Sequence, residues 1–220
     1  MKNLRTVLLM DSNSALRVRQ LANLSGIELN AEVVCDQASL FIAFEDPPDL
    51  LLSFGTGIIV PERLLGLPGL LAFNVHAASP CYPGRDPHHF AVYDGVTQYG
   101  ATLHYMTALV DAGQIVDVML FDVPSEITPL RLLELANEAA WILVGRLFKK
   151  LALGETLSPV KGLSWGNRKP TRKMFLELCK VDASMTAVEF ARRLRATNMP
   201  GYNNLYMELH GYRFHTDSES

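Results

Sequence analysis

The stretch Leu70-Leu71-Ala72-Phe73-Asn74-Val75-His76 decides the fold, because it is an apolar run that ends in an amide and an imidazole. A short unbroken apolar run is typical of a strand buried on both faces of a parallel sheet. A second such run, Ala101–Met106, comes shortly before Val110-Asp111-Ala112-Gly113. Because α/β proteins keep their sites at strand ends, we expect Asn74, His76 and Asp111 to converge there.

These three side chains suit acyl transfer to an amine. The attacking amine loses a proton as the carbonyl carbon becomes tetrahedral, and the oxygen that gains negative charge needs a fixed donor; an imidazole and a carboxamide supply these functions. A neighbouring Asp111 is expected to fix the tautomer of His76 and to raise its pKa above the usual value of about 6.5. Each residue also has an ordinary structural role, since Asn and Asp-x-Gly are common in turns and a single His is often a core residue.

The chain carries five separated motifs in one order: Asn74-Val75-His76, Pro83–Pro87, Ala91–Gly95, Tyr99–Met106 and Val110–Ile115. Together they resemble the folate-dependent formyltransferases, a family that includes methionyl-tRNA, glycinamide ribonucleotide and sugar N-formyltransferases. The resemblance is specific from about Asp49 to Ile115. It implies an α/β fold with a Rossmann-like, mostly parallel sheet of the formyltransferase type and a short C-terminal α+β extension.

The resemblance also implies roles for the residues of the site. Asn74 would hold the formyl oxygen, His76 would handle the proton, and Asp111 would orient His76 or raise its pKa. The formyl donor would be 10-formyltetrahydrofolate, and no metal is implied. The pterin of this donor would lie between the segment after the apolar run 50–54, the loop after His76 and the backbone near Asp111. The residues expected to contact it are Phe54, Gly55, Ile59, Ala78, Ser79, Pro80, Cys81 and Leu109.

The acceptor is expected to be the primary amine of a small metabolite, preferably a nucleotide-linked amino sugar. A net charge of −3 and a pI near 6.1 disfavour a nucleic-acid partner, because nucleic-acid binding proteins present a basic face. Arg85 and Asp86 follow Gly84 at the expected mouth of the site, where they contact the acceptor or form a local ion pair. The segment that ends in Tyr202 resembles the region after the catalytic core of sugar N-formyltransferases and methionyl-tRNA formyltransferases, so Tyr202 is a further candidate for substrate contact. Two alternatives stay open: hydrolysis of formyltetrahydrofolate, and a folate- or nucleotide-binding module without turnover.

The sequence predicts a catalytic domain over 1–154, an extension over 155–216 and a disordered tail over 217–220. The family usually has two strand-helix units before the strand at 50–54, and here at least one element is expected to be missing. A long helix is predicted from the N-cap Thr128 and the first-turn Pro129 to the stop at Gly154, forming core or a dimer surface. The other expected elements are a strand over 5–10, a helix over 15–24, a loop over 155–170, a helix over 186–197 and a hairpin about Gly211.

Several groups are expected to have no special chemistry. Three cysteines without paired spacing indicate neither a disulfide framework nor a zinc site. Adjacent His88 and His89 point about 100° apart on a helix, so we expect a polar helix face or a substrate contact rather than a shared metal. His104 is expected in the core or on a sheet face. The first apolar run is too short for a signal peptide or a membrane helix, so a cytoplasmic protein without membrane contact is expected, and a homodimer is left open.

Overall fold

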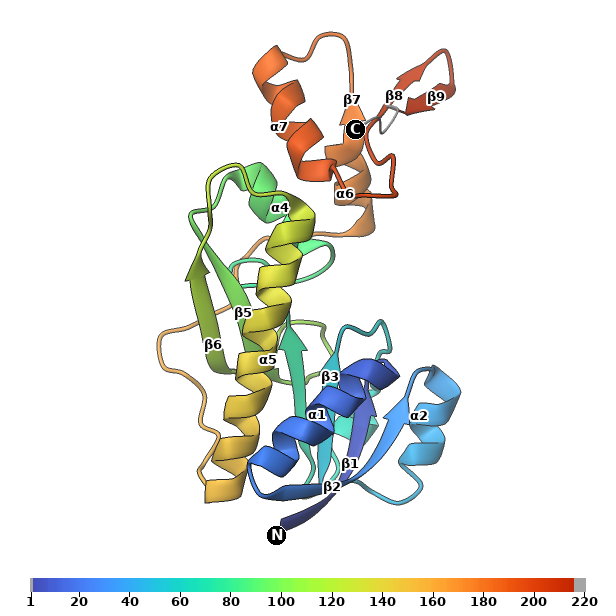
Figure 1. Cartoon of the computed structure of the whole chain (residues 1–220). Coiled ribbons are helices and arrows are strands. Elements are labelled where there is room, and N and C mark those ends of the chain that lie inside the picture. The colour runs from blue at the N-terminus through green and yellow to red at the C-terminus, as the bar shows by residue number, and fades with distance from the viewer. Residues whose placement is uncertain (1, 216–220) are drawn as a thin grey trace.

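The computed structural model describes residues 2–215, in which strands and helices alternate along the first half of the chain (Figure 1). Six strands form one sheet in the order β2-β1-β3-β4-β5-β6. Its elements are β1 (Lys2–Leu9), α1 (Ser12–Leu24), β2 (Ile27–Val34), α2 (Gln37–Ala43), β3 (Leu50–Phe54), α3 (Glu62–Leu65), β4 (Leu71–His76), α4 (Pro87–Asp94), β5 (Gln98–Tyr105), β6 (Ile115–Asp122) and α5 (Pro129–Leu153).

The directions of the strands confirm the predicted α/β class with a mostly parallel sheet. Strands β2, β1, β3 and β4 pair in parallel, whereas β5 is antiparallel to β4 and β6 is antiparallel to β5. Because β5 runs backwards, Tyr105 pairs with Phe73 and Thr102 pairs with His76. The expectation that the ends of these two strands meet is therefore wrong, and the loop over 106–114 has to return Asp111 to the site.

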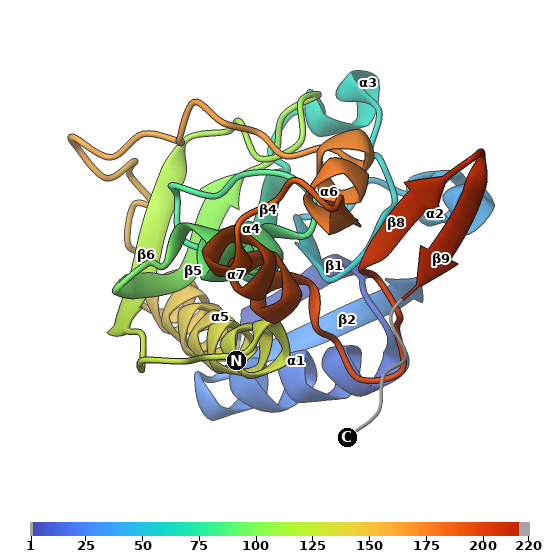
Figure 2. The same ribbon diagram turned by 90° about the horizontal axis from the view of Figure 1, so that it is seen from above.

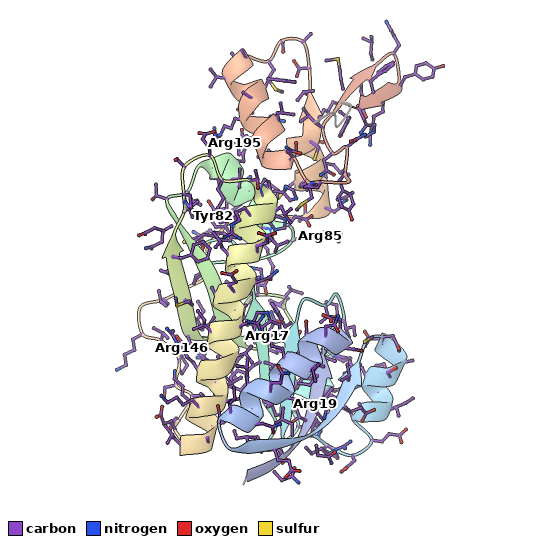
Figure 3. The ribbon with its side chains drawn as sticks, viewed as in Figure 1. Arg17, Arg19, Tyr82, Arg85, Arg146 and Arg195 are labelled. Carbon is purple, nitrogen blue, oxygen red and sulfur yellow. The ribbon has the colours of Figure 1, made fainter. Side chains whose placement is uncertain are left out.

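Helices cover both faces of the sheet. Helices α1 and α5 pack on one face (Figure 2). There, apolar side chains of the strands form the larger core with Leu143 and Leu147 of α5. On the same face, Trp141 meets Phe54 edge to face at 5.0 Å between ring centroids. Arg17 extends from α1 (Figure 3), and its guanidinium lies 4.6 Å from the centre of the Trp141 ring. The opposite face packs against α2 and α3 in a smaller cluster.

Helix α5 begins and ends as predicted. The hydroxyl of Thr128 accepts a hydrogen bond from the amide of Arg131, Pro129 occupies the first turn, and Gly154 ends the helix with φ of 67°. Its apolar stripe, which includes Ala136, Ala140 and Leu143, is fully buried against the sheet. Of the two roles expected for this stripe, core is therefore the one that the structure has.

The amino end contains both strand-helix units, so the expectation of a missing element is wrong. Strand β2 escaped recognition because it lies at the edge of the sheet, where exposed and buried residues alternate and no continuous apolar run appears. Helix α2 has only seven residues, and the carboxylate of Asp36 caps it by accepting from the amide of Ser39. The two strand-helix units β1-α1 and β2-α2 are therefore complete, but the short helix and the edge strand have only weak sequence patterns.

The last quarter of the chain forms a small α+β unit at one end of α5 (Figure 1). It comprises α6 (Arg172–Cys179), β7 (Lys180–Val181), α7 (Ala187–Thr197), β8 (Tyr206–Leu209) and β9 (Tyr212–His215), with the strands in the order β7-β8-β9. The predicted helix and hairpin are present, while α6 and β7 were not expected. The predicted tail over 217–220 lies outside the described residues. Within the described chain, every helix is too short or too polar to span a bilayer.

Candidate active site

Polar side chains gather on the sheet face opposite α5. Ser53, Asn74 and His104 are in register across β3, β4 and β5, and His76 lies two residues beyond Asn74 on the same strand. Because alternate residues of a strand point to opposite faces, Asn74 and His76 share one face while Phe73 and Val75 enter the core. The same alternation gives the polar face a second imidazole, that of His104.

Asp111 reaches this row from the loop between β5 and β6. Its Oδ2 lies 3.6 Å from Nδ1 of His76, and its Oδ1 lies 3.5 Å from Nε2 of His104. The same Oδ2 accepts a hydrogen bond of 2.8 Å from the amide of Gly84. The residue has φ of 44° and is only 6% exposed, so the loop holds a buried carboxylate in a conformation that is uncommon outside glycine. Asp111 therefore joins the two imidazoles to the backbone of the loop that begins after β4.

Hydrogen-bond partners assign the tautomers of the two rings. His76 donates from Nε2 to the carbonyl of Tyr82 at 2.8 Å, which leaves Nδ1 facing Asp111. His104 donates from Nδ1 to the carbonyl of Tyr105 at 2.8 Å, so its Nε2 accepts from Nδ2 of Asn74 at 3.1 Å. Asn74, His104, Asp111 and His76 thus form one connected chain of polar groups. His104 lies on a sheet face, as expected, and it also belongs to the site because it pairs with Asn74 across β4 and β5.

The protonation states differ from the simple expectation for an Asp-His pair. Burial lowers the pKa of His76, and the attraction of Asp111 opposes this without overcoming it. The predicted net rise in the pKa of His76 is therefore wrong. Burial alone would raise the pKa of Asp111, but the contacts with His104, His76 and the amide of Gly84 together lower it. At neutral pH the site therefore holds a neutral imidazole beside an ionised carboxylate.

Two cavities meet at this polar chain. The first lies between the end of β3 and the loop over 106–111, and its wall is largely apolar, with Ile58, Ile59, Val60, Met106 and Leu109. The second has a volume of about 300 Å³ and is lined by residues of α4, α5 and the end of β4, including His76. Thr56, Asn74, Val110 and Asp111 line both. Two ligands can therefore approach Asn74 and Asp111 from different sides.

The residues predicted to bind folate divide among three places. Ile59 and Leu109 line the first cavity, whereas Phe54 and Gly55 line the second. The four loop residues Ala78, Ser79, Pro80 and Cys81 line neither. Ala78 is buried, and its carbonyl accepts from the hydroxyl of Thr102 at 2.7 Å. This loop therefore packs against the protein itself and forms the wall behind the site, apart from the exposed Cys81.

The residues predicted to bind the acceptor are also separated. Asp86 lines the second cavity with φ of 52°, whereas Arg85 is exposed, forms a 3.3 Å ion pair with Asp86 and lines neither cavity (Figure 3). The structure thus has the ion pair that was one of the two expectations. Tyr202 is 66% exposed in the turn after α7 and lines neither cavity, because its backbone bridges to Met199 beyond the end of that helix. Contact of Tyr202 with the acceptor therefore stays a prediction.

Trp165 is a site residue that the sequence did not reveal. It lies in the predicted loop over 155–170, and its indole N–H donates to the carbonyl of Gly113 at 2.7 Å. Its ring meets His104 edge to face at 4.9 Å and His76 at 5.9 Å between centroids. The following amide, of Gly166, donates to the carbonyl of Pro80 at 2.8 Å. The loop is therefore a strap that lies against both imidazoles and the segment after β4.

The cations of this strap have protein partners. Lys169 donates to the carbonyl of Val110, and Arg168 lies 3.4 Å from the carboxylate of Asp94. Lys169 therefore ties the strap to the loop that carries Asp111. Among the described residues, no group of three or more His, Cys, Asp or Glu side chains is placed to hold a metal ion.

Comparisons with known proteins identify the family of this chain. Residues 21–143 match the model of the formyl transferase family. Methionyl-tRNA formyltransferase from Halalkalibacterium halodurans is 33% identical over 131 residues, which are 59% of this chain and 41% of that protein. The chain therefore spans less than half the length of this curated relative.

Solved structures resemble the whole chain in fold. A 4-N formyltransferase from Francisella tularensis superposes with a TM-score of 0.81 at 18% identity, covering 99% of this chain and 97% of that one. A sugar N-formyltransferase from Shewanella sp. FDAARGOS_354 has a TM-score of 0.72 at 18% identity, with 98% and 96% covered. At such low identity these likenesses show the fold alone. The family match covers more than half of the chain, and the protein therefore belongs to the formyl transferase family of folate-dependent enzymes.

Proposed function

We propose that this protein transfers a formyl group from 10-formyltetrahydrofolate to the primary amine of a nucleotide-linked amino sugar. Enzymes of the family use a formyl donor derived from tetrahydrofolate. The observation that supports the proposal is the meeting of two cavities at Asn74 and Asp111, with His76 on one side. A two-substrate transfer requires this arrangement, because the donor and the acceptor have to reach one point from separate pockets.

The donor suits the first cavity. A pterin is a flat ring with polar edges, and this cavity combines the apolar side chains of Ile58, Ile59 and Leu109 with the polar side chains of Ser53 and Thr56. Asn74 also lines this cavity. The side-chain amide of Asn74 has two N–H groups, of which one is used by His104, so the other is free to bind the formyl oxygen.

The reaction balances with the groups in place. The amine nitrogen attacks the formyl carbon and forms the new N–C bond, while Asn74 stabilises the oxygen that becomes negative. The nitrogen then loses a proton to Nδ1 of His76, the unprotonated position of a ring whose Nε2 is held by Tyr82. Asp111 stabilises the resulting imidazolium at 3.6 Å. Breaking the bond between the formyl carbon and N10 of the donor, with a proton returned to N10, gives a formamide and tetrahydrofolate.

An amino sugar is preferred as the acceptor for two reasons. The formal charge of −3 does not suit a tRNA, whose phosphates need a basic surface. The solved structures that cover almost the whole of this chain include a 4-N formyltransferase and a sugar N-formyltransferase. Formation of a homodimer stays a prediction, to be checked by measuring the mass of the protein in solution.

The direct test follows tetrahydrofolate release with a panel of nucleotide-linked amino sugars, and identifies the product by mass spectrometry. We expect a formylated sugar from the wild type, a loss of about 10²- to 10³-fold in kcat for Asn74→Ala, and a loss of about 10²- to 10⁴-fold for His76→Ala. Asn23→Ala, on the exposed side of α1, is the matched control and should keep full activity.

The same assay separates the two alternatives. Formate released without any formylated sugar identifies a hydrolase. Folate that binds with no turnover in the wild type identifies a binding module. Either result contradicts the proposed transfer.

A further inference from the structure

The second cavity contains polar groups that the catalytic chain does not use. Helix α4 contributes His88 to its wall, and helix α5 contributes Asn137. Two carboxylates, those of Asp86 and Asp111, also line it, while no Lys or Arg of the described residues does. The described lining therefore contains carboxylates but no cation, and α4 and α5 each contribute one uncharged polar side chain to it.

His88 differs from the other buried histidines. His76, His89 and His104 each use one ring nitrogen to donate to a backbone carbonyl, that of Tyr82, Ala196 and Tyr105 respectively. His88 is only 8% exposed, yet its Nδ1 is buried with no hydrogen-bond partner among the described residues. His89 is therefore a structural histidine, and the expected polar helix face is wrong for both, since both are buried.

An unpaired buried nitrogen is unfavourable for folding. Such a group costs about 1–3 kcal/mol, and an apolar ring of similar size would avoid the cost. The other ring nitrogen, Nε2, is neither hydrogen-bonded nor buried among the described residues, so a partner can reach it from the cavity that His88 lines. Burial and the neighbouring His89 lower the pKa of His88 to about 3, which keeps the ring uncharged at neutral pH.

Asn137 of α5 is a second polar group of this cavity that has no partner among the described residues. It is partly exposed at the cavity, and its side-chain amide makes no hydrogen bond to any residue of the described chain. The neighbouring wall residue on α5 is Leu133, one turn earlier and apolar. Asn137 is thus the polar group that α5 presents to this cavity.

We propose that His88 and Asn137 bind hydroxyl groups of the acceptor's sugar ring, an inference that rests on the proposed function. Both side chains are uncharged and can donate and accept, which matches a hydroxyl group. No Lys or Arg of the described chain lines this cavity, so a phosphate in it would meet the carboxylate of Asp111 without a cation. The diphosphate of a nucleotide sugar therefore lies outside it. The two residues therefore select the ring and its amine, and leave the nucleotide to other parts of the surface.

The test compares His88→Phe and Asn137→Leu with the wild type on a nucleotide-linked 4-amino-4,6-dideoxyhexose. We expect the KM for this sugar to rise about tenfold in each variant, as for loss of a hydrogen bond, with kcat and the KM for folate nearly unchanged. Glu138→Gln, on the exposed side of α5, is the control and should leave all three constants unchanged. His88→Gln keeps a hydrogen-bonding group and should lie between wild type and His88→Phe.

Deoxy analogues of the same sugar give a sharper readout. The wild type should discriminate about tenfold against an analogue that lacks the contacted hydroxyl, and His88→Phe or Asn137→Leu should lose that discrimination. A merely structural role predicts the same ratio of the two sugars in every variant. An equal ratio in the wild type and both variants, or a KM for folate that rises in parallel, overturns the inference.

Calorimetric binding of the sugar without folate separates this inference from the proposed function. If the wild type transfers no formyl group to any sugar, the proposed function fails, while affinity that still falls in His88→Phe and Asn137→Leu upholds the recognition. Equal affinity in all three proteins, or no binding to the wild type, overturns the recognition as well.

Discussion

Asp111 shows how much one residue can determine in this site. Its carboxylate contacts two imidazoles and a backbone amide, and it stays ionised although it is buried. Its charge opposes the fall in the pKa of His76 that burial causes. At 3.6 Å from Nδ1 of His76, it can also accept a hydrogen bond from that nitrogen once the ring is protonated.

We predict that Asp111→Asn weakens catalysis and moves the acid limb of the pH profile. The amide keeps the shape but not the charge, so the pKa of His76 should fall further and the acid limb of kcat/KM should move to lower pH. Because a less basic imidazole takes the proton less readily, kcat/KM should drop by about 10²-fold or more on the plateau. A pH-rate profile measures both effects. An acid limb that moves upward would contradict the assigned electrostatics.

The strap over 155–170 is an element without regular structure that nevertheless completes the site. The sequence indicated a loop there, and it is a loop, but nothing in its pattern places Trp165 against His76 and His104. That placement depends on contacts between segments about 50 residues apart, such as the bond from Trp165 to Gly113. Local sequence does not encode such contacts. The adjacent pair Trp165-Gly166 is the only feature of the loop sequence that sets this position apart.

Trp165→Phe tests this element. The substitution keeps an aromatic ring beside the imidazoles and removes the donor to Gly113, so we expect the free energy of unfolding to fall by about 1 kcal/mol and kcat to fall several-fold as the imidazoles loosen. Urea denaturation and steady-state kinetics measure the two effects. Trp141→Phe, on α5 against Phe54, is the matched control and should affect stability but not kcat. If kcat falls equally in both variants, the strap has no specific role in the site.

The loop over 106–114 depends on one glycine. A Cβ at Gly113 would lie 1.7 Å from the carbonyl oxygen of Tyr105, which no L-residue tolerates without moving the backbone. We therefore predict that Gly113→Ala displaces Asp111, lowers the melting temperature and removes most of the activity. Gly145→Ala, in the middle of α5, is the control: its Cβ meets only Leu21, at 3.8 Å, so the change should be neutral or stabilise by up to about 1 kcal/mol through helix propensity. Thermal unfolding of both variants decides the point.

At the scale of the whole molecule, continuous patterns were easier to predict than pairings. The buried strands, the caps of α5 and the C-terminal hairpin follow from local periodicity and turn residues, and all were expected. The edge strand β2 and the short α2 lack strong periodicity, and the reversed direction of β5 depends on long-range pairing. The site divides in the same way: motifs located Asn74, His76 and Asp111, whereas His104, Trp165 and Asn137 became visible only when the chain was folded.

The buried histidines make the stability of the whole chain dependent on pH. Burial lowers the pKa of His76, His88 and His89, so each is neutral in the folded state and takes up a proton near pH 6.5 on unfolding. The stability that these neutral rings contribute is fully present above pH 6.5. It is lost as the pH falls toward their pKa values in the folded protein, which for His88 is about 3. At pH 5, His88 alone should lower the free energy of unfolding by about 2 kcal/mol.

Urea unfolding at pH 7.5 and pH 5 measures this difference in the free energy of unfolding. The difference should shrink by about 2 kcal/mol in His88→Phe. It should stay unchanged in the control His210→Asn, because His210 lies in an exposed turn where Asn tolerates the φ of 51°. If His88→Phe keeps the pH dependence of the wild type, the ring is protonated in the folded protein and its buried nitrogen has a partner.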